Sequence, residues 1–200
     1  GMTSAEAGGF VPPDSHGTVG PTQVVVASNV YVRSFNKSTG VADGILNLSL
    51  STFFAAAPGG VGAGLSDPRV KFDPISRRWF ISIITVDTTN RVLFAVSSGP
   101  NITSTSSFTF FAFAATAGGG AEPQTPFADY DTMGIDAKGV YFGVNMFNTA
   151  GTAFLGSTVF VINKGTLVYS GAIDDSNNKG KAKKNYVAEA IDAVMAGKPV

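Results

Sequence analysis

The chain has 200 residues, a formal net charge of zero and no cysteine. The absence of cysteine excludes thiol redox chemistry and every mechanism that needs a cysteine nucleophile. The balanced charge leaves no basic surface to neutralise phosphates, so we expect no nucleic-acid partner. Hydrophobic residues make up 44% of the chain and charged residues 14%, the reverse of a disordered composition.

No apolar run approaches the roughly 20 residues that a membrane-spanning helix needs, so we expect no membrane span. The N-terminus has no basic segment followed by an apolar stretch, the pattern of a signal peptide. Low charge with many Ser, Thr, Asn and aromatic residues is typical of exported proteins. We therefore expect a secreted, periplasmic or cell-envelope protein.

Short β-runs separated by Gly, Pro, Asn and Asp dominate the chain. The predicted strands are, in chain order, 23–27, 30–35, 45–50, 69–72, 78–86, 91–97, 108–114, 132–135, 140–147, 157–163 and 166–170. A single helix is predicted over 185–196, because Asn185 can cap its start and Val187, Ile191 and Val194 share one face.

The strands group into three units, roughly Thr18 to Leu50, Arg69 to Ala114 and Thr132 to Ser170. Four antiparallel strands per unit with Gly-rich connectors is the pattern of β-propeller blades; a β-sandwich is the alternative. We predict an all-β fold, a partial β-propeller-like arrangement of about three four-stranded units over 1–170, followed by a linker and one C-terminal helix over 171–200.

The blades of a propeller close into a ring, and three units are few for that purpose. Propellers are typically built from about four to eight blades, and open sheet edges invite association with other strands. Three units therefore predict a fragment, a homodimer that completes the sheet assembly, or a fold other than a propeller.

Three segments carry Asp, Gly and aromatic residues at characteristic spacings. They are PPDSHGTVGP at 12–21, SDPRVKFD at 66–73 followed by Arg78-Trp79, and FADYDTMGI at 127–135. Together they resemble the blade-opening segments of a family of exported bacterial β-propeller proteins. The resemblance covers about residues 10–165 and implies a fold and export, but no reaction.

The C-terminal part resembles a different family. Residues 157–200 hold a hairpin, the turn GAIDD at 171–175 and a final AGKPV at 196–200. This resembles the end of redoxin-type thioredoxin-fold proteins. Without cysteine the resemblance implies a local hairpin–helix shape and no redox activity. A chimera, or a redox-inactive thioredoxin-like remnant, is therefore a further alternative.

Candidate ligand-binding residues lie in all three of the blade-opening segments. His16, the single histidine, and Asp14 are predicted to sit in a turn rich in Pro and Gly. They could ligate a metal or act as acid and base, or Asp14 could satisfy backbone donors in a turn. Asp67 and Arg69 form a charged rim near Trp79. That rim could hold a sugar or an acidic ligand, or form a turn-edge ion pair.

The third segment places Asp129 and Asp131 on either side of Tyr130. Carboxylates two residues apart on a strand can face the same way. They could bind Ca²⁺, form a glycosidase carboxylate pair, or satisfy backbone donors in a loop. Calcium is the one candidate cofactor.

We predict a non-catalytic extracellular binding or structural module for a glycan or cell-surface ligand. Its expected ligand-binding residues are Asp14, His16, Asp67, Arg69 and Tyr130, with Asp129 and Asp131 as metal ligands and no catalytic residue. The alternative is a glycan-directed hydrolase of propeller type that uses Asp67, Asp129 or Asp131, so the sequence leaves the question of enzyme activity open.

Overall fold

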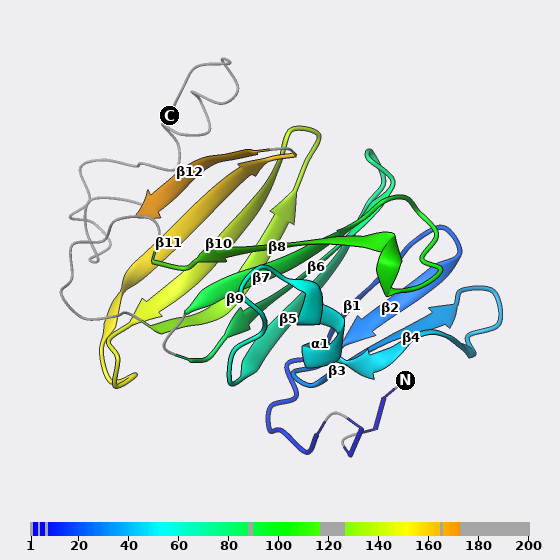
Figure 1. Ribbon diagram of the computed structural model, residues 1–200, viewed down its shortest axis with the longest axis horizontal. Coiled ribbons are helices and arrows are strands. Elements are labelled where there is room, and N and C mark those ends of the chain that lie inside the picture. Colours follow the sequence, from blue (N-terminus) through cyan, green and yellow to red (C-terminus); the bar gives the residue numbers. More distant parts are fainter. Residues whose placement is uncertain are drawn as a thin grey trace. The chain divides into compact units, whose positions relative to one another are not determined.

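The computed structural model describes residues 2–3, 5–6, 8–87, 90–116, 127–164 and 166–172. These residues form twelve strands in three four-stranded sheets, as Figure 1 shows. They divide into two compact units, Gly1–Phe113 and Ala114–Val200. The all-β class predicted from the sequence is confirmed.

The first sheet is drawn in blue and cyan in Figure 1. It consists of β1 (His16–Val19), β2 (Gln23–Ala27), β3 (Tyr31–Asn36) and β4 (Ala42–Ser49). Val25 and Ala27 are fully buried while Val24 and Val26 are half-buried, because successive side chains of a strand point to opposite faces.

A short helix follows where the sequence predicts the end of a strand. Helix α1 (Leu50–Phe53) leads into the 3₁₀ turn η1 (Phe54–Ala56). The hydroxyl of Ser49 caps α1 by accepting a hydrogen bond from the N–H of Thr52 at 3.1 Å. The strand therefore stops at Ser49, one residue earlier than predicted.

The second sheet contains the most buried strand of the described residues. It consists of β5 (Leu65–Asp73), β6 (Arg78–Thr85), β7 (Arg91–Ser97) and β8 (Phe108–Ala114), with the 3₁₀ turn η2 (Thr105–Ser107) before β8. Every residue of β6 after Arg78 is buried, as its run of Trp, Phe and Ile residues predicts.

The third sheet lies in the second compact unit. It consists of β9 (Phe127–Ile135), β10 (Gly139–Phe147), β11 (Phe154–Asn163) and β12 (Thr166–Ala172). β10 pairs with β9 on one side and β11 on the other, both antiparallel. β9 begins five residues before the predicted strand.

In each sheet the strands neighbour one another in chain order. Such a four-stranded meander is the unit from which propeller blades are built. The three predicted four-stranded units are therefore confirmed.

The core of the first unit lies between its two sheets and beneath α1. Its buried residues are Val25, Ala27, Val32, Leu46, Leu50, Phe53, Phe54, Ala57, Val70, Trp79, Ile81, Ile83, Leu93, Ala95, Ile102 and Phe108. The indole N–H of Trp79 donates to the carbonyl of Pro100 at 2.8 Å. This satisfies the one polar atom of a ring that is otherwise surrounded by apolar groups.

The predicted helix at 185–196 lies outside the described residues, as do residue 165 and residues 173–200 of the redoxin-like end. Within the part of the chain that the structure describes, we find no helix with the length and hydropathy needed to cross a membrane.

Candidate functional site

The first strands of the first two sheets, β1 and β5, are joined by a hydrogen bond. The backbone N–H of Val70 donates to the Nδ1 atom of His16 at 3.1 Å. The two strands run in the same direction, because a second link, through Asn29, joins the residues that precede His16 to those that precede Val70. Their starts therefore lie at one end of the unit.

Asn29 connects the two strand starts. Its side-chain amide donates to Oδ2 of Asp14 at 2.6 Å and to the carbonyl of Pro12 at 3.4 Å. Its Oδ1 accepts from the backbone N–H of Asp67 at 2.8 Å. Asn29 itself is 7% exposed, so these hydrogen bonds form largely out of water and hold both strand starts firmly.

Asp14 and Asp67 share an unusual backbone conformation. Their φ angles are 45° and 55°, in the left-handed region that Asp tolerates better than most residues. Asp67 is buried at 5% exposure, and Asp14 is half-buried. The structure thus brings together two of the predicted ligand-binding residues through a third residue, Asn29, which the sequence marks only as a break between two β-runs.

His16 and Arg69 lie at the same strand starts. Burial lowers the pKa of His16, and the positive charges of Arg69 and Lys71 lower it further. The neutral imidazole accepts the Val70 hydrogen bond through Nδ1 and keeps its second nitrogen as a donor. The Arg69 guanidinium donates to the carbonyl of Pro68 at 3.2 Å. His16 therefore holds two strands together and does not sit in a turn.

The segment around Tyr130 belongs to the third sheet and forms a β-bulge. Thr132 pairs with Gly143 and Asp129 pairs with Asn145, so Tyr130 and Asp131 both lie opposite Val144. Tyr130 has a φ of 50° and is 60% exposed, whereas Asp131 is fully buried. The bulge interrupts the regular alternation on which the predicted pairing of Asp129 with Asp131 depends.

The predicted calcium site stays a prediction. Among the described residues no group of three or more His, Cys, Asp or Glu side chains is arranged to hold a metal ion. Ca²⁺ also takes backbone carbonyls and amide oxygens as ligands, so a site with fewer carboxylates is compatible with that finding.

A polar row crosses the third sheet beside the bulge. Asp129, Asn145 and Ser157 occupy directly opposite positions on β9, β10 and β11. The hydroxyl of Ser157 donates to Oδ1 of Asn145 at 2.9 Å. Each of the three residues is half-buried, so the row offers carboxylate and amide groups at a surface that water and solutes can reach.

Comparison with known proteins supports the fold. No family model matches the chain, and no curated protein matches it. Among solved structures, an α-L-arabinanase from Penicillium chrysogenum, complexed with arabinobiose, is similar with a TM-score of 0.55 and 11% identity. The match covers 86% of this chain and 52% of the arabinanase.

Two further matches are weaker. The catalytic domain of an α-L-arabinofuranosidase from Coprinopsis cinerea gives a TM-score of 0.47 at 13% identity, over 83% of this chain and 51% of that chain. An exo-1,5-α-L-arabinanase from a bovine ruminal metagenomic library gives 0.41 at 9% identity, over 80% and 55%. The chain spans about half the length of these proteins. At such low identity the similarity establishes the fold alone.

Proposed function

We propose that this chain is part of a glycan-directed hydrolase of propeller type, with Asp14 and Asp67 as its carboxylate pair. The observation that carries the proposal is the Asn29 bridge, which holds these two residues at the starts of neighbouring strands. The similarity of the fold to an arabinanase supports the same class of substrate.

Two carboxyl groups supply the chemistry that glycoside hydrolysis needs. One protonates the oxygen of the leaving sugar, and the other attacks the anomeric carbon or activates a water molecule. The left-handed backbone at both residues and the shared amide of Asn29 fix where the two side chains begin. Such preorganisation is what a pair of groups acting on one bond requires.

One observation favours a second candidate, the non-catalytic binding module expected from the sequence. The carboxylate of Asp14 already accepts a hydrogen bond of 2.6 Å from Asn29. A carboxylate oriented in this way is suited to accept hydrogen bonds from sugar hydroxyls without any bond being broken.

The proposal includes a location outside the cell or in its envelope, and a homodimeric assembly. A polymeric glycan substrate favours a secreted or cell-envelope protein. A homodimer that completes the sheet assembly predicts a discrete mass of twice 20.6 kDa in light scattering, whereas a well-behaved monomer contradicts it.

The test compares turnover of linear arabinan and xylan by the wild-type chain and by Asp14→Asn and Asp67→Asn, with reducing ends as the readout. Each substitution keeps the size of the side chain and removes the carboxylate, so we expect a loss of at least about 100-fold. Asp136→Asn, an acidic turn residue of the other unit, is the control and should keep full activity. Binding of these glycans without turnover by the wild type supports the second candidate instead.

A further inference from the structure

Each of the three sheets has a left-handed residue near the start of its first strand. These residues are Asp14, Asp67 and Tyr130, with φ angles of 45°, 55° and 50°. Six residues beyond the last two stand Asp73 and Asp136, which have the same role in their own sheets.

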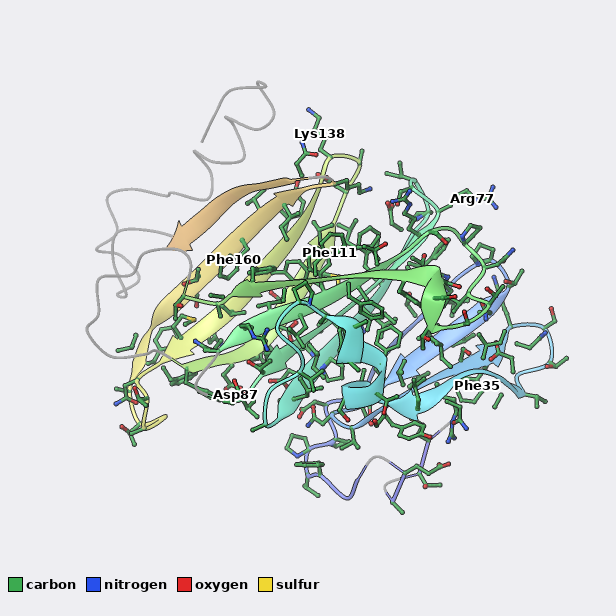
Figure 2. The ribbon with its side chains drawn as sticks, in the orientation of Figure 1. Phe35, Arg77, Asp87, Phe111, Lys138 and Phe160 are labelled. Atoms are coloured by element: carbon green, nitrogen blue, oxygen red, sulfur yellow. The ribbon has the colours of Figure 1, made fainter. Side chains whose placement is uncertain are left out.

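Asp73 and Asp136 close the turns that follow β5 and β9. Oδ1 of Asp73 accepts from the N–H of Ile75 at 3.0 Å, and Oδ1 of Asp136 accepts from the N–H of Lys138 at 2.8 Å. Figure 2 shows Arg77 and Lys138 at the outer ends of these two turns. Tyr130 therefore occupies in its sheet the position that Asp67 occupies in the second sheet.

A tyrosine is an unfavourable residue for this position. Asp and Asn visit the left-handed region readily, while larger side chains do so rarely. Tyr130 is 60% exposed, so packing in the core does not account for its presence. A bulky residue held in a disfavoured conformation at the surface points to a role for the side chain itself.

A row of polar side chains begins next to Tyr130 in the chain. Asp129, its neighbour in the chain, begins the polar row that continues through Asn145 and Ser157. The row supplies carboxylate acceptors and an amide N–H₂ donor. Lys138 and Lys164, the basic residues of this sheet with described side chains, lie together at its opposite end, where the N–H of Lys164 donates to the carbonyl of Lys138 at 3.2 Å.

We propose that Tyr130 and the polar row formed by Asp129, Asn145 and Ser157 bind a neutral sugar unit. The C–H face of the sugar packs on the Tyr130 ring, and its hydroxyls bond to Asp129 and Asn145. Aromatic side chains together with a few placed polar groups are the common lining of small-ligand sites. The absence of a cation in the row disfavours acidic sugars. The inference rests on the proposed glycan-directed function and adds a sugar-binding position in a different sheet.

The experiment separates the ring of Tyr130 from its backbone conformation. Tyr130→Asn tolerates the left-handed φ but lacks a ring, and Tyr130→Phe keeps the ring. Binding of arabinobiose, xylobiose and digalacturonate to the 200-residue chain is followed by calorimetry. We expect binding of a neutral disaccharide, a loss of about tenfold in affinity for Tyr130→Asn, and a change of less than about threefold for Tyr130→Phe. Phe154→Leu changes another exposed aromatic residue of the same sheet and should leave affinity unchanged.

Separate readouts distinguish this inference from the proposed function. Asp14→Asn and Asp67→Asn should abolish hydrolysis while disaccharide affinity at Tyr130 persists. If the wild type binds neither neutral disaccharide, or if Tyr130→Asn binds as well as the wild type with an unchanged melting temperature, the inference is overturned, whatever the hydrolysis assay shows. Tighter binding of digalacturonate than of the neutral disaccharides overturns it as well.

Discussion

The Nδ1 atom of His16 accepts a hydrogen bond from the backbone N–H of Val70 at 3.1 Å, which links β1 to β5. Protonation of the imidazole turns Nδ1 into a donor and breaks this link. Because the folded protein lowers the pKa of His16 from 6.5, the unfolded chain binds the proton more readily. The resulting stability is present above pH 6.5 and is lost as the pH falls through the lower pKa of the folded state.

We therefore predict that the free energy of unfolding in urea decreases between pH 7 and pH 5. His16→Gln keeps a hydrogen-bond acceptor but does not titrate, so its stability should change less over this interval. Equal slopes for the two proteins would show that His16 is not the titrating group.

Asn29 is predicted to be the most sensitive polar residue of the site. Asn29→Ala leaves the buried N–H of Asp67 without its 2.8 Å acceptor and removes the donor to Asp14. An unsatisfied buried polar group costs about 1–3 kcal/mol, which urea unfolding detects directly. Asn47→Ala, at an exposed position, should cost less than half as much, and a similar cost for both variants contradicts the central role of Asn29.

Gly20 is predicted to tolerate no side chain, because a Cβ there would overlap the ring of Trp79, with the ring atom Cη2 at 2.8 Å. The ring is fully buried and cannot move without disturbing the core. We expect Gly20→Ala to destabilise the protein by about 1–3 kcal/mol. The fluorescence of Trp79, the single tryptophan, should change as well. Gly99→Ala, where a Cβ meets nothing within 4 Å, should leave both signals unchanged.

The strands could be predicted from the sequence because they depend on local patterns. In β2, for example, the consecutive β-branched residues Val24, Val25 and Val26 favour a strand, and Asn29 breaks the run. The grouping into four-stranded units follows from the spacing of these runs. The short helix after Ser49 was missed, because Leu50 also fits the alternation of the preceding strand.

The candidate site could be predicted only in part. Asp14 and Asp67 stand out because each opens a recognisable segment. Their bridge through Asn29 spans 38 residues between Asn29 and Asp67, and no local pattern encodes a contact of that kind. The bulge at Tyr130 is hidden for another reason, since one extra residue in a strand shifts the register without changing its composition.

Gly62, in the loop between the first two sheets, is predicted to tolerate a side chain poorly because it lies close to Asp87. A Cβ at Gly62 would overlap Oδ2 of Asp87 and lie 2.8 Å from its Cγ, while Asp87 accepts from the N–H of Ala63 at 2.8 Å. Asp87 lies at the other end of the second sheet from Arg77 (Figure 2). Gly62→Ala should therefore lower the melting temperature more than Gly40→Ala. Both glycines have a φ of +70°, but a Cβ at Gly40 meets nothing within 4 Å, so equal losses would mean that only the backbone strain matters.

Asp43 is predicted to link stability to acid pH. Burial alone would raise its pKa, but hydrogen bonds from Gln23, Ser34 and the N–H of Ile45 outweigh that effect and lower it below 3.8. A lowered carboxyl pKa stabilises the fold above the pKa of the unfolded chain, and this stability is lost as the pH falls through the folded value.

Gln23 links Asp43 to Ile102, in the segment between β7 and β8. Its Nε2 donates to Asp43 at 3.0 Å and to the carbonyl of Ile102 at 3.1 Å, and its Oε1 accepts from the N–H of Ile102 at 2.8 Å. Asp43→Asn should therefore be less stable than the wild type at pH 7, and the difference should shrink below pH 4 in acid-unfolding curves. The pKa of the exposed Asp136 carboxyl is lowered as well, so the stability difference between Asp136→Asn and the wild type should also shrink in acid. If the difference in stability between Asp43→Asn and the wild type stays constant with pH, the carboxylate of Asp43 is not the source of the acid sensitivity.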